Sequence, residues 1–147
     1  LGRDFTIERS AATFLDPQDW HDYYASLYRD PLNIQRVAAA IEKLARLCRE
    51  DGSALFVANY PELRNPRDYP FPYVDEAVSR IAERNRLKYI ALLPAVRDLP
   101  PESLWVTRPD PHPSIAAHEA FAGALFRFFD AQLRSTPHRK EPADGDV

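Results

Sequence analysis

The sequence lacks several features that would define the class of the protein at once. It has no methionine and one cysteine, Cys48, among 147 residues, and no apolar run approaches the roughly 20 residues that cross a bilayer. A single cysteine excludes an internal disulfide framework and a cysteine-rich zinc site. The charged segment 1–10 lacks the apolar core of a secretion signal. Because an initiator methionine is also missing, we expect a fragment or a processed piece of a longer protein.

The chain also lacks an excess of positive charge. Lys and Arg number 19 against 22 Asp and Glu, which gives a net charge of −3, so no overall positive field would attract nucleic acid. It does have the material for a hydrophobic core, since 45% of the residues are hydrophobic and 12% are aromatic. This length and composition predict one domain of ordinary size.

Helical patterns dominate the first third of the chain. Aromatic side chains spaced three and four apart predict a short amphipathic helix within residues 16–30, which could pack on a partner element or cover a groove. A longer helix is expected from Pro31, with Asp30 as its N-cap and Gly52 as its stop. The predicted inner face of this helix comprises Ile34, Val37, Ala38, Ile41, Leu44, Ala45 and Cys48.

Two short apolar segments, 53–61 and 87–96, have the composition of strands buried on both faces. A helix is expected between them over 75–86, and the last helix is predicted over 114–133. The inward-facing residues of the first of these helices are predicted to be Val74, Val78, Ile81 and Ala82. Those of the last helix are predicted to be Ile115, Ala122, Leu125, Phe126, Phe129 and Leu133. Residues 135–147 form a polar tail that we expect to be disordered.

The alternation of helices and strands predicts an α/β fold with a parallel sheet and helices on its faces. Two strands are too few for such a sheet, so further strands must come from residues 1–30, from a partner chain or from absent sequence. An incomplete sheet exposes an edge, and self-association through that edge is a possible consequence. Ligands of open α/β sheets bind outside the carboxyl ends of the strands, where the long segment 97–113 is expected.

That long segment ends in "RPDPHPS", in which an acidic and a basic side chain alternate with prolines. Pro109, Pro111 and Pro113 fix their φ angles and stiffen the loop, as a group held for catalysis requires. The carboxylate of Asp110 could accept the Nδ1–H of His112 and leave Nε2 free as a general base. The motif therefore indicates an acid–base pair, and the alternative is an ordinary proline-rich surface loop.

Other polar side chains have plainer interpretations. His118 falls on the predicted apolar face of the last helix, where a histidine is more often a hydrogen-bonded core residue than a ligand, although its ring could brace the loop of Asp110. Asp110, His112 and His118 could also hold a metal, but a metal would need a further ligand nearby. Ser53 in "DGS" and Cys48 are expected to be structural. A solvated basic face is expected from Arg80, Arg84, Arg86 and Lys88.

The block "PDPHPSIAAHEAFAGAL" resembles the C-terminal block of the SGNH (GDSL-type) hydrolases, in which Asp, one or two residues and His-Pro precede an Ala-rich helix. Asp110, His112 and Pro113 match this pattern. Ser114 stands where the family usually has Asn, and Ala117 precedes His118 where Gly-His is common. The upstream order of helix, strand, loop, helix and strand is also similar, so the resemblance covers approximately residues 20–134.

The resemblance implies a three-layer α/β/α, flavodoxin-like domain, of which residues 1–134 form the C-terminal part. It implies ester hydrolysis through a Ser-His-Asp triad, with His112 as general base and Asp110 orienting it, on a small-molecule ester such as a lipid, an acetylated sugar or a thioester. No cofactor and no metal is implied. The family's Gly-Asp-Ser nucleophile block and its oxyanion-hole blocks are missing, so we expect the chain alone to be inactive. The alternatives are a non-catalytic α/β interaction module and a small metal-binding domain.

Overall fold

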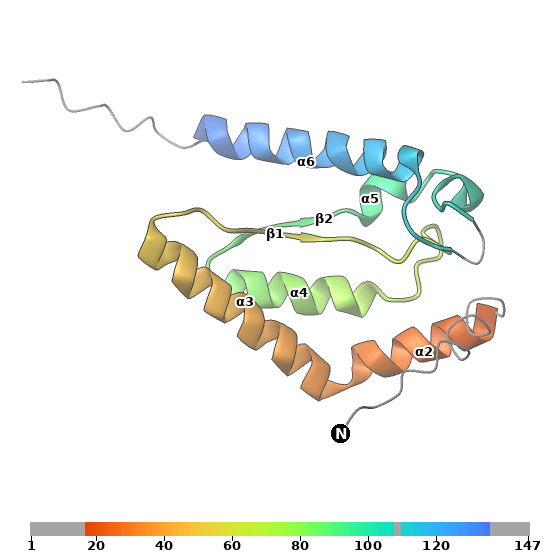
Figure 1. Cartoon of the computed structure of the whole chain (residues 1–147), viewed down its shortest axis with the longest axis horizontal. Helices are drawn as coiled ribbons and strands as arrows, with labels where there is room; N and C mark the ends of the chain where they lie inside the picture. The colour runs from red at the N-terminus through yellow and green to blue at the C-terminus, as the bar shows by residue number, and fades with distance from the viewer. Residues whose placement is uncertain (1–16, 108–109, 136–147) are drawn as a thin grey trace, which may run out of the picture.

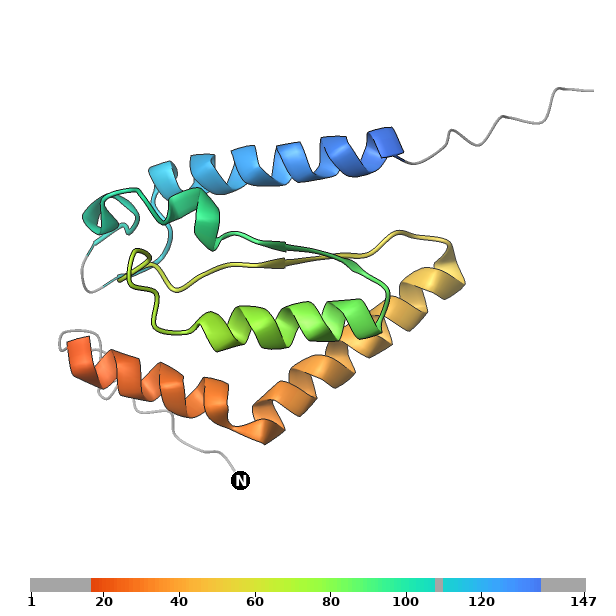
Figure 2. The same cartoon turned by 180° about the vertical axis from the view of Figure 1, so that it is seen from behind.

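The chain has a mixed α/β structure in which helices lie on both sides of a two-stranded parallel sheet (Figures 1 and 2). The computed structural model describes residues 17–107 and 110–135. Its elements are α2 (Pro17–Arg29), α3 (Pro31–Asp51), β1 (Phe56–Asn59), α4 (Pro72–Arg84), β2 (Lys88–Ala91), α5 (Leu93–Val96), the 3-10 helix η1 (Pro101–Ser103) and α6 (Ile115–Ser135). Any strand within residues 1–16, and the tail predicted beyond Ser135, lie outside the described residues.

The ends of the first two helices follow from local sequence. The carboxylate of Asp30 accepts a hydrogen bond from the backbone N–H of Leu32 at 2.9 Å, and Pro31 occupies the first helical position of α3. Gly52 ends α3 with φ at 75°, a conformation that a residue without Cβ adopts freely. Both boundaries confirm the prediction, as does the aromatic helix α2 within residues 16–30.

The two strands pair in parallel, with Phe56 opposite Lys88 and Asn59 opposite Ala91. Side chains of a strand point alternately to opposite faces, and β1 follows this rule. Phe56 contacts two aromatic rings of α6, whereas the side chain of Asn59 donates a hydrogen bond to Asp75 on α4. Helices α6 and α4 therefore cover opposite faces of the sheet.

The strands are less buried than the sequence predicted. Most residues of β1 are partly buried, and Ala58 in its middle is exposed. The physical reason is that each strand pairs on one side only within residues 17–107 and 110–135. The second segment is also shorter than predicted, because Pro94 lies in the first turn of the short helix α5 instead of closing a strand.

The inner faces predicted for two helices are partly wrong. On α6 the buried side chains are those of Ala117 and Phe121, while Phe126 is 73% exposed. On α3 only Ala45 is fully buried, and Leu44 is half exposed. The side chains predicted to face inward that are in fact exposed are Val37, Leu44, Ile115, Ala122, Phe126 and Leu133. Phe129 faces inward as predicted and contacts Phe56 of β1, with ring centres 5.1 Å apart, although it remains partly exposed. Both helices carry apolar residues on more than one side, so periodicity alone does not select the packed face.

Two hydrophobic clusters hold the elements together. The first joins the sheet side of α6 to α5 and to the loop after β1, with Leu92, Val96, Leu104 and Phe121 almost completely buried. The second joins α2 to the start of α4 around the fully buried ring of Phe71. These clusters fix the segments that meet beyond the carboxyl ends of the two strands.

Candidate active site

The predicted pair lies on the returning arm of a short antiparallel turn between η1 and α6. The backbone N–H groups of Val106 and Thr107 donate to the carbonyls of His112 and Asp110, at 3.1 Å each, and Trp105 bridges to Pro113. A residue that precedes proline is restricted to extended backbone, and both Asp110 and His112 precede prolines. Side chains two apart on an extended arm point to the same side, so the Asp-Pro-His spacing itself brings the two together.

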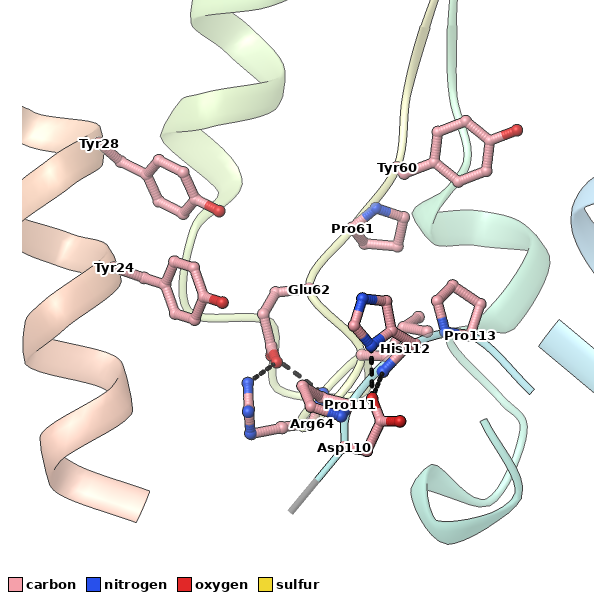
Figure 3. Close-up of a pocket in the computed structure, with 11 residues that line it drawn as sticks. Tyr24, Tyr28, Tyr60, Pro61, Glu62, Arg64, Asp110, Pro111, His112 and Pro113 are labelled. Carbon is pink, nitrogen blue, oxygen red and sulfur yellow. Dashed lines mark hydrogen bonds and ion pairs between the residues drawn. The ribbon is translucent and has the colours of Figure 1, made fainter. Parts of the chain in front are cut away.

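The structure brings the Asp110 carboxylate and the His112 ring into direct contact (Figure 3). Oδ1 of Asp110 is hydrogen-bonded to Nδ1 of His112 and also accepts the backbone N–H of His112 at 3.2 Å. These bonds stabilise the carboxylate, and they lower the pKa of Asp110 below its ordinary value. A carboxylate only accepts hydrogen bonds, so Nδ1 carries the proton and Nε2 has the free lone pair that a general base needs.

The His112 ring stands at the edge of an open cleft of about 600 Å³. The cleft is lined by Tyr24, Tyr28, Tyr60, Pro61, Glu62, Leu63, Arg64, Asp110, Pro111, His112 and Pro113. The side chain of His112 is 84% exposed and that of Asp110 is 51% exposed. The pair is therefore accessible, with nothing among the described residues covering it.

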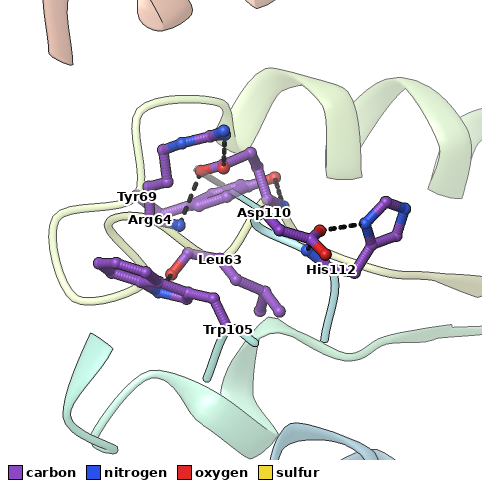
Figure 4. A network of polar contacts seen from close by, with 7 residues as sticks. Leu63, Arg64, Tyr69, Trp105, Asp110 and His112 are labelled. Carbon is purple, nitrogen blue, oxygen red and sulfur yellow. Dashed lines mark hydrogen bonds and ion pairs between the residues drawn. The ribbon is translucent and has the colours of Figure 1, made fainter. Parts of the chain in front are cut away.

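A nearly buried ion pair lines this cleft (Figure 3), and Figure 4 shows its Arg64 together with Asp110 and His112. Arg64 and Glu62 are joined by a salt bridge, and their side chains are only 9% and 7% exposed. Burial raises the pKa of Glu62, and the backbone N–H and guanidinium of Arg64 oppose that rise. The guanidinium also lies 5.3 Å from the ring centre of Trp20 on α2. Through this ion pair the loop after β1 lines the same cleft as Asp110.

One further contact connects that loop to the motif, and the hydroxyl of Ser114 holds the end of the motif. The indole N–H of Trp105 donates to the carbonyl of Leu63 at 3.2 Å, across 42 residues of sequence. The side chain of Ser114 accepts the backbone N–H of Ala117 at 3.2 Å and donates to the carbonyl of Ser103. Ser114 is therefore the N-cap of α6, and its hydroxyl is occupied in holding the end of the motif.

Helix α2 supplies the tyrosine wall of the cleft. Tyr24 and Tyr28 line the cleft and pack on Phe71, with ring centres 6.3 and 5.1 Å from it. Burial raises the pKa of Tyr28 to about 12. The sequence indicated only that these aromatic residues could cover a groove. No sequence pattern placed the α2 tyrosines, Glu62 or Arg64 beside His112, because their meeting depends on long-range packing.

The cleft holds no hydroxyl of serine or threonine and no thiol among its lining residues. Ser53 lies at the opposite end of the sheet, and its Oγ donates to Asp51 at 2.7 Å. Cys48 is partly buried on α3. The described part of the chain thus presents a hydrogen-bonded imidazole and carboxylate without a serine, threonine or cysteine nucleophile in their cleft.

His118 is not where the sequence placed it. It is exposed on α6 instead of lying on an apolar face, and its backbone N–H donates to the carbonyl of Ser114. The reason is that the buried stripe of α6 passes through Ala117 and Phe121. Within residues 17–107 and 110–135, no three His, Cys, Asp or Glu side chains gather closely enough to hold a metal. Pro109, the first proline of the motif, lies outside the described residues.

Comparisons with known proteins give no relative for this chain. No protein-family model, curated protein or solved structure matches it. Among the residues that the structure describes, none of the helices has the length and apolar character that a membrane span requires.

Proposed function

We propose that this chain is the C-terminal part of a serine esterase or acyl hydrolase of the SGNH type and supplies the Asp-His of its triad. The observation that carries the proposal is the hydrogen bond from His112 Nδ1 to Asp110, made at an open cleft beyond the carboxyl ends of β1 and β2. In the proposed reaction Nε2 of His112 takes the proton of a serine hydroxyl and later gives it to the leaving alcohol. Asp110 fixes the tautomer and stabilises the imidazolium.

The missing nucleophile is part of the same proposal. A base without a nucleophile or oxyanion donors gives negligible ester turnover, and the exposure of His112 fits a site with one wall absent. We place the serine on a further strand of a three-layer, flavodoxin-like sheet, of which β1 and β2 are two strands. Helices on both faces of the pair support that arrangement. In the absence of the other strands, the open edge of the sheet is the surface through which copies would self-associate.

The substrate in this proposal is a small-molecule ester, such as a lipid, an acetylated sugar or a thioester, and the reaction needs no cofactor. The alternative is a non-catalytic α/β interaction module. The two differ in what the encoding gene contains, because the hydrolase requires an upstream strand followed by a Gly-Asp-Ser block.

The direct test uses the full-length protein and p-nitrophenyl acetate. We expect His112→Ala to lower kcat by about 10²- to 10⁴-fold, the range for loss of a general base. The matched control is His118→Ala, which removes an exposed imidazole six residues away and should leave kcat unchanged. Circular dichroism checks that both variants fold. Retained turnover in His112→Ala, or an equal loss in His118→Ala, would reject the role of His112 and favour the interaction module.

A further inference from the structure

A second cleft lies at the other end of the sheet, beside the amino ends of the strands. It has a volume of about 600 Å³ and is formed where the turn after α3 meets the turn between α4 and β2. Figures 1 and 2 both show these two turns at the end of the sheet opposite the motif of Asp110 and His112. Four of its nine lining residues are cationic, namely Arg49, Arg84, Arg86 and Lys88, and none is acidic. We call this the cationic cleft.

The charges of the cationic cleft are not balanced by carboxylates in the described part of the chain. Neighbouring basic residues elsewhere on the same helices are paired: Arg46 with Glu50 at 3.3 Å and Arg80 with Glu76 at 3.0 Å. None of the four cations of the cleft forms such an ion pair within residues 17–107 and 110–135. The nearby carboxylate of Asp51 accepts the hydroxyl of Ser53. Four exposed like charges around one hollow repel one another, and a bound anion would relieve this repulsion.

The ending of α4 explains how Arg86 comes to line the cleft. Helix α4 ends in a Schellman motif, in which the N–H of Leu87 donates to the carbonyl of Ala82 and the N–H of Arg86 to that of Glu83, at 2.9 Å each. The motif needs a left-handed residue, and Arg86 has φ of +59°. Glycine is the usual residue at this position because any Cβ is strained there. The end of α4 thus places Arg86 among the residues that line the cleft.

We propose that the cationic cleft binds a ligand carrying phosphate groups, independently of the ester chemistry at the other end of the sheet. Guanidinium groups present paired donors that match the oxygens of phosphate, and three of the four cations are arginines. The volume exceeds what one inorganic phosphate fills, so the cleft suits a diphosphate or a phosphomonoester with an attached group. The overall charge of −3 argues against a nucleic-acid surface.

The test is a calorimetric titration of the 147-residue chain with inorganic pyrophosphate at low ionic strength. The cleft variant is Arg86→Gly combined with Lys88→Gln, since glycine suits the backbone of residue 86 and the fold is preserved. The control variant, Arg36→Gln combined with Lys43→Gln, removes the same charge from exposed positions on α3 outside the cleft. We expect the cleft variant to bind at least about tenfold more weakly and the control to bind within about twofold of the parent, since tenfold corresponds to one charge-assisted contact.

A second experiment identifies whether the phosphate belongs to a lipid headgroup or to a soluble ligand. The chain is sedimented with phosphatidylcholine vesicles that contain phosphatidic acid or lack it. Binding that requires phosphatidic acid assigns the site to a lipid headgroup, and binding of pyrophosphate without binding to vesicles assigns it to a soluble ligand. The proposal is overturned if the chain binds neither probe, or if the control variant loses as much affinity as the cleft variant.

Discussion

Phe71 holds α2 on the rest of the fold, and replacing it tests how the tyrosine wall of the candidate active site is kept in place. Its side chain is fully buried. Aromatic rings surround it at centre-to-centre distances of 5.1–6.3 Å: Trp20, His21, Tyr24, Tyr28, Tyr69 and Tyr73. Four of these six belong to α2, so we expect Phe71→Ala to release α2 in particular.

The expected cost of Phe71→Ala is about 3–5 kcal/mol, the usual range for removing a buried phenylalanine ring. A domain of this size has a total unfolding free energy of about 5–15 kcal/mol, so the loss is a large part of the whole. The substitution weakens the cluster between α2 and α4. The cluster of Leu92, Leu104 and Phe121 on the other side of the sheet does not include Phe71 and should be unaffected. The α2 helix should therefore open locally before the sheet unfolds.

Amide hydrogen exchange measures this directly. In Phe71→Ala the amides of α2 should exchange much faster, while those of α6 keep most of their protection. Phe126→Ala is the matched control, because Phe126 is 73% exposed and its loss should cost less than about 0.5 kcal/mol. If Phe71→Ala does not fold, Phe71→Leu retains more of the ring volume and should show a weaker effect in the same direction. Equal loss of protection in α2 and α6, or unchanged protection in α2, would refute the reasoning.

Two further predictions concern titration. The pKa of Asp110 lies below its ordinary value chiefly because of the hydrogen bond to the His112 side chain. We therefore expect His112→Ala to raise the pKa of Asp110, measured by NMR of its carboxyl carbon. An unchanged pKa would show that the hydrogen bond is not formed. Burial raises the pKa of Tyr28 from 10.0 to about 12, because the folded state favours its neutral phenol. This contribution to the free energy of unfolding is fully present below pH 10 and is lost as the pH rises through 12. Ultraviolet titration of Tyr28→Phe against the parent chain should identify this late-ionising phenol, and a difference spectrum centred near pH 10 would contradict the burial.

Features that depend on neighbouring residues were predictable from the sequence. Asp30 and Pro31 at one end and Gly52 at the other define α3, since a cap is formed by residues within one turn of the helix. The contact between Asp110 and His112 is equally local, because two extended residues before prolines have little choice of direction. Both predictions needed no knowledge of the tertiary structure.

Features that depend on packing were not predictable in the same way. The last helix has apolar side chains on several sides, and only contacts with Phe56 and Tyr60 of the sheet region show that Phe121 and Phe128 face it. The neighbours of His112 in the cleft come from α2 and from the loop after β1, more than 40 residues away in sequence. Similarly, Arg49 meets Arg86 at the cationic cleft only because two turns converge at one end of a parallel sheet.

The short separation between Asp110 and His112 has a consequence for acid denaturation. Two residues joined by one proline stay near each other in the denatured ensemble, so part of their attraction persists without the fold. Proton uptake by the carboxyl then differs little between native and denatured chains, and the linkage between protonation and folding is weak. Loss of secondary structure at low pH should accordingly be almost the same for the parent chain and for Asp110→Asn.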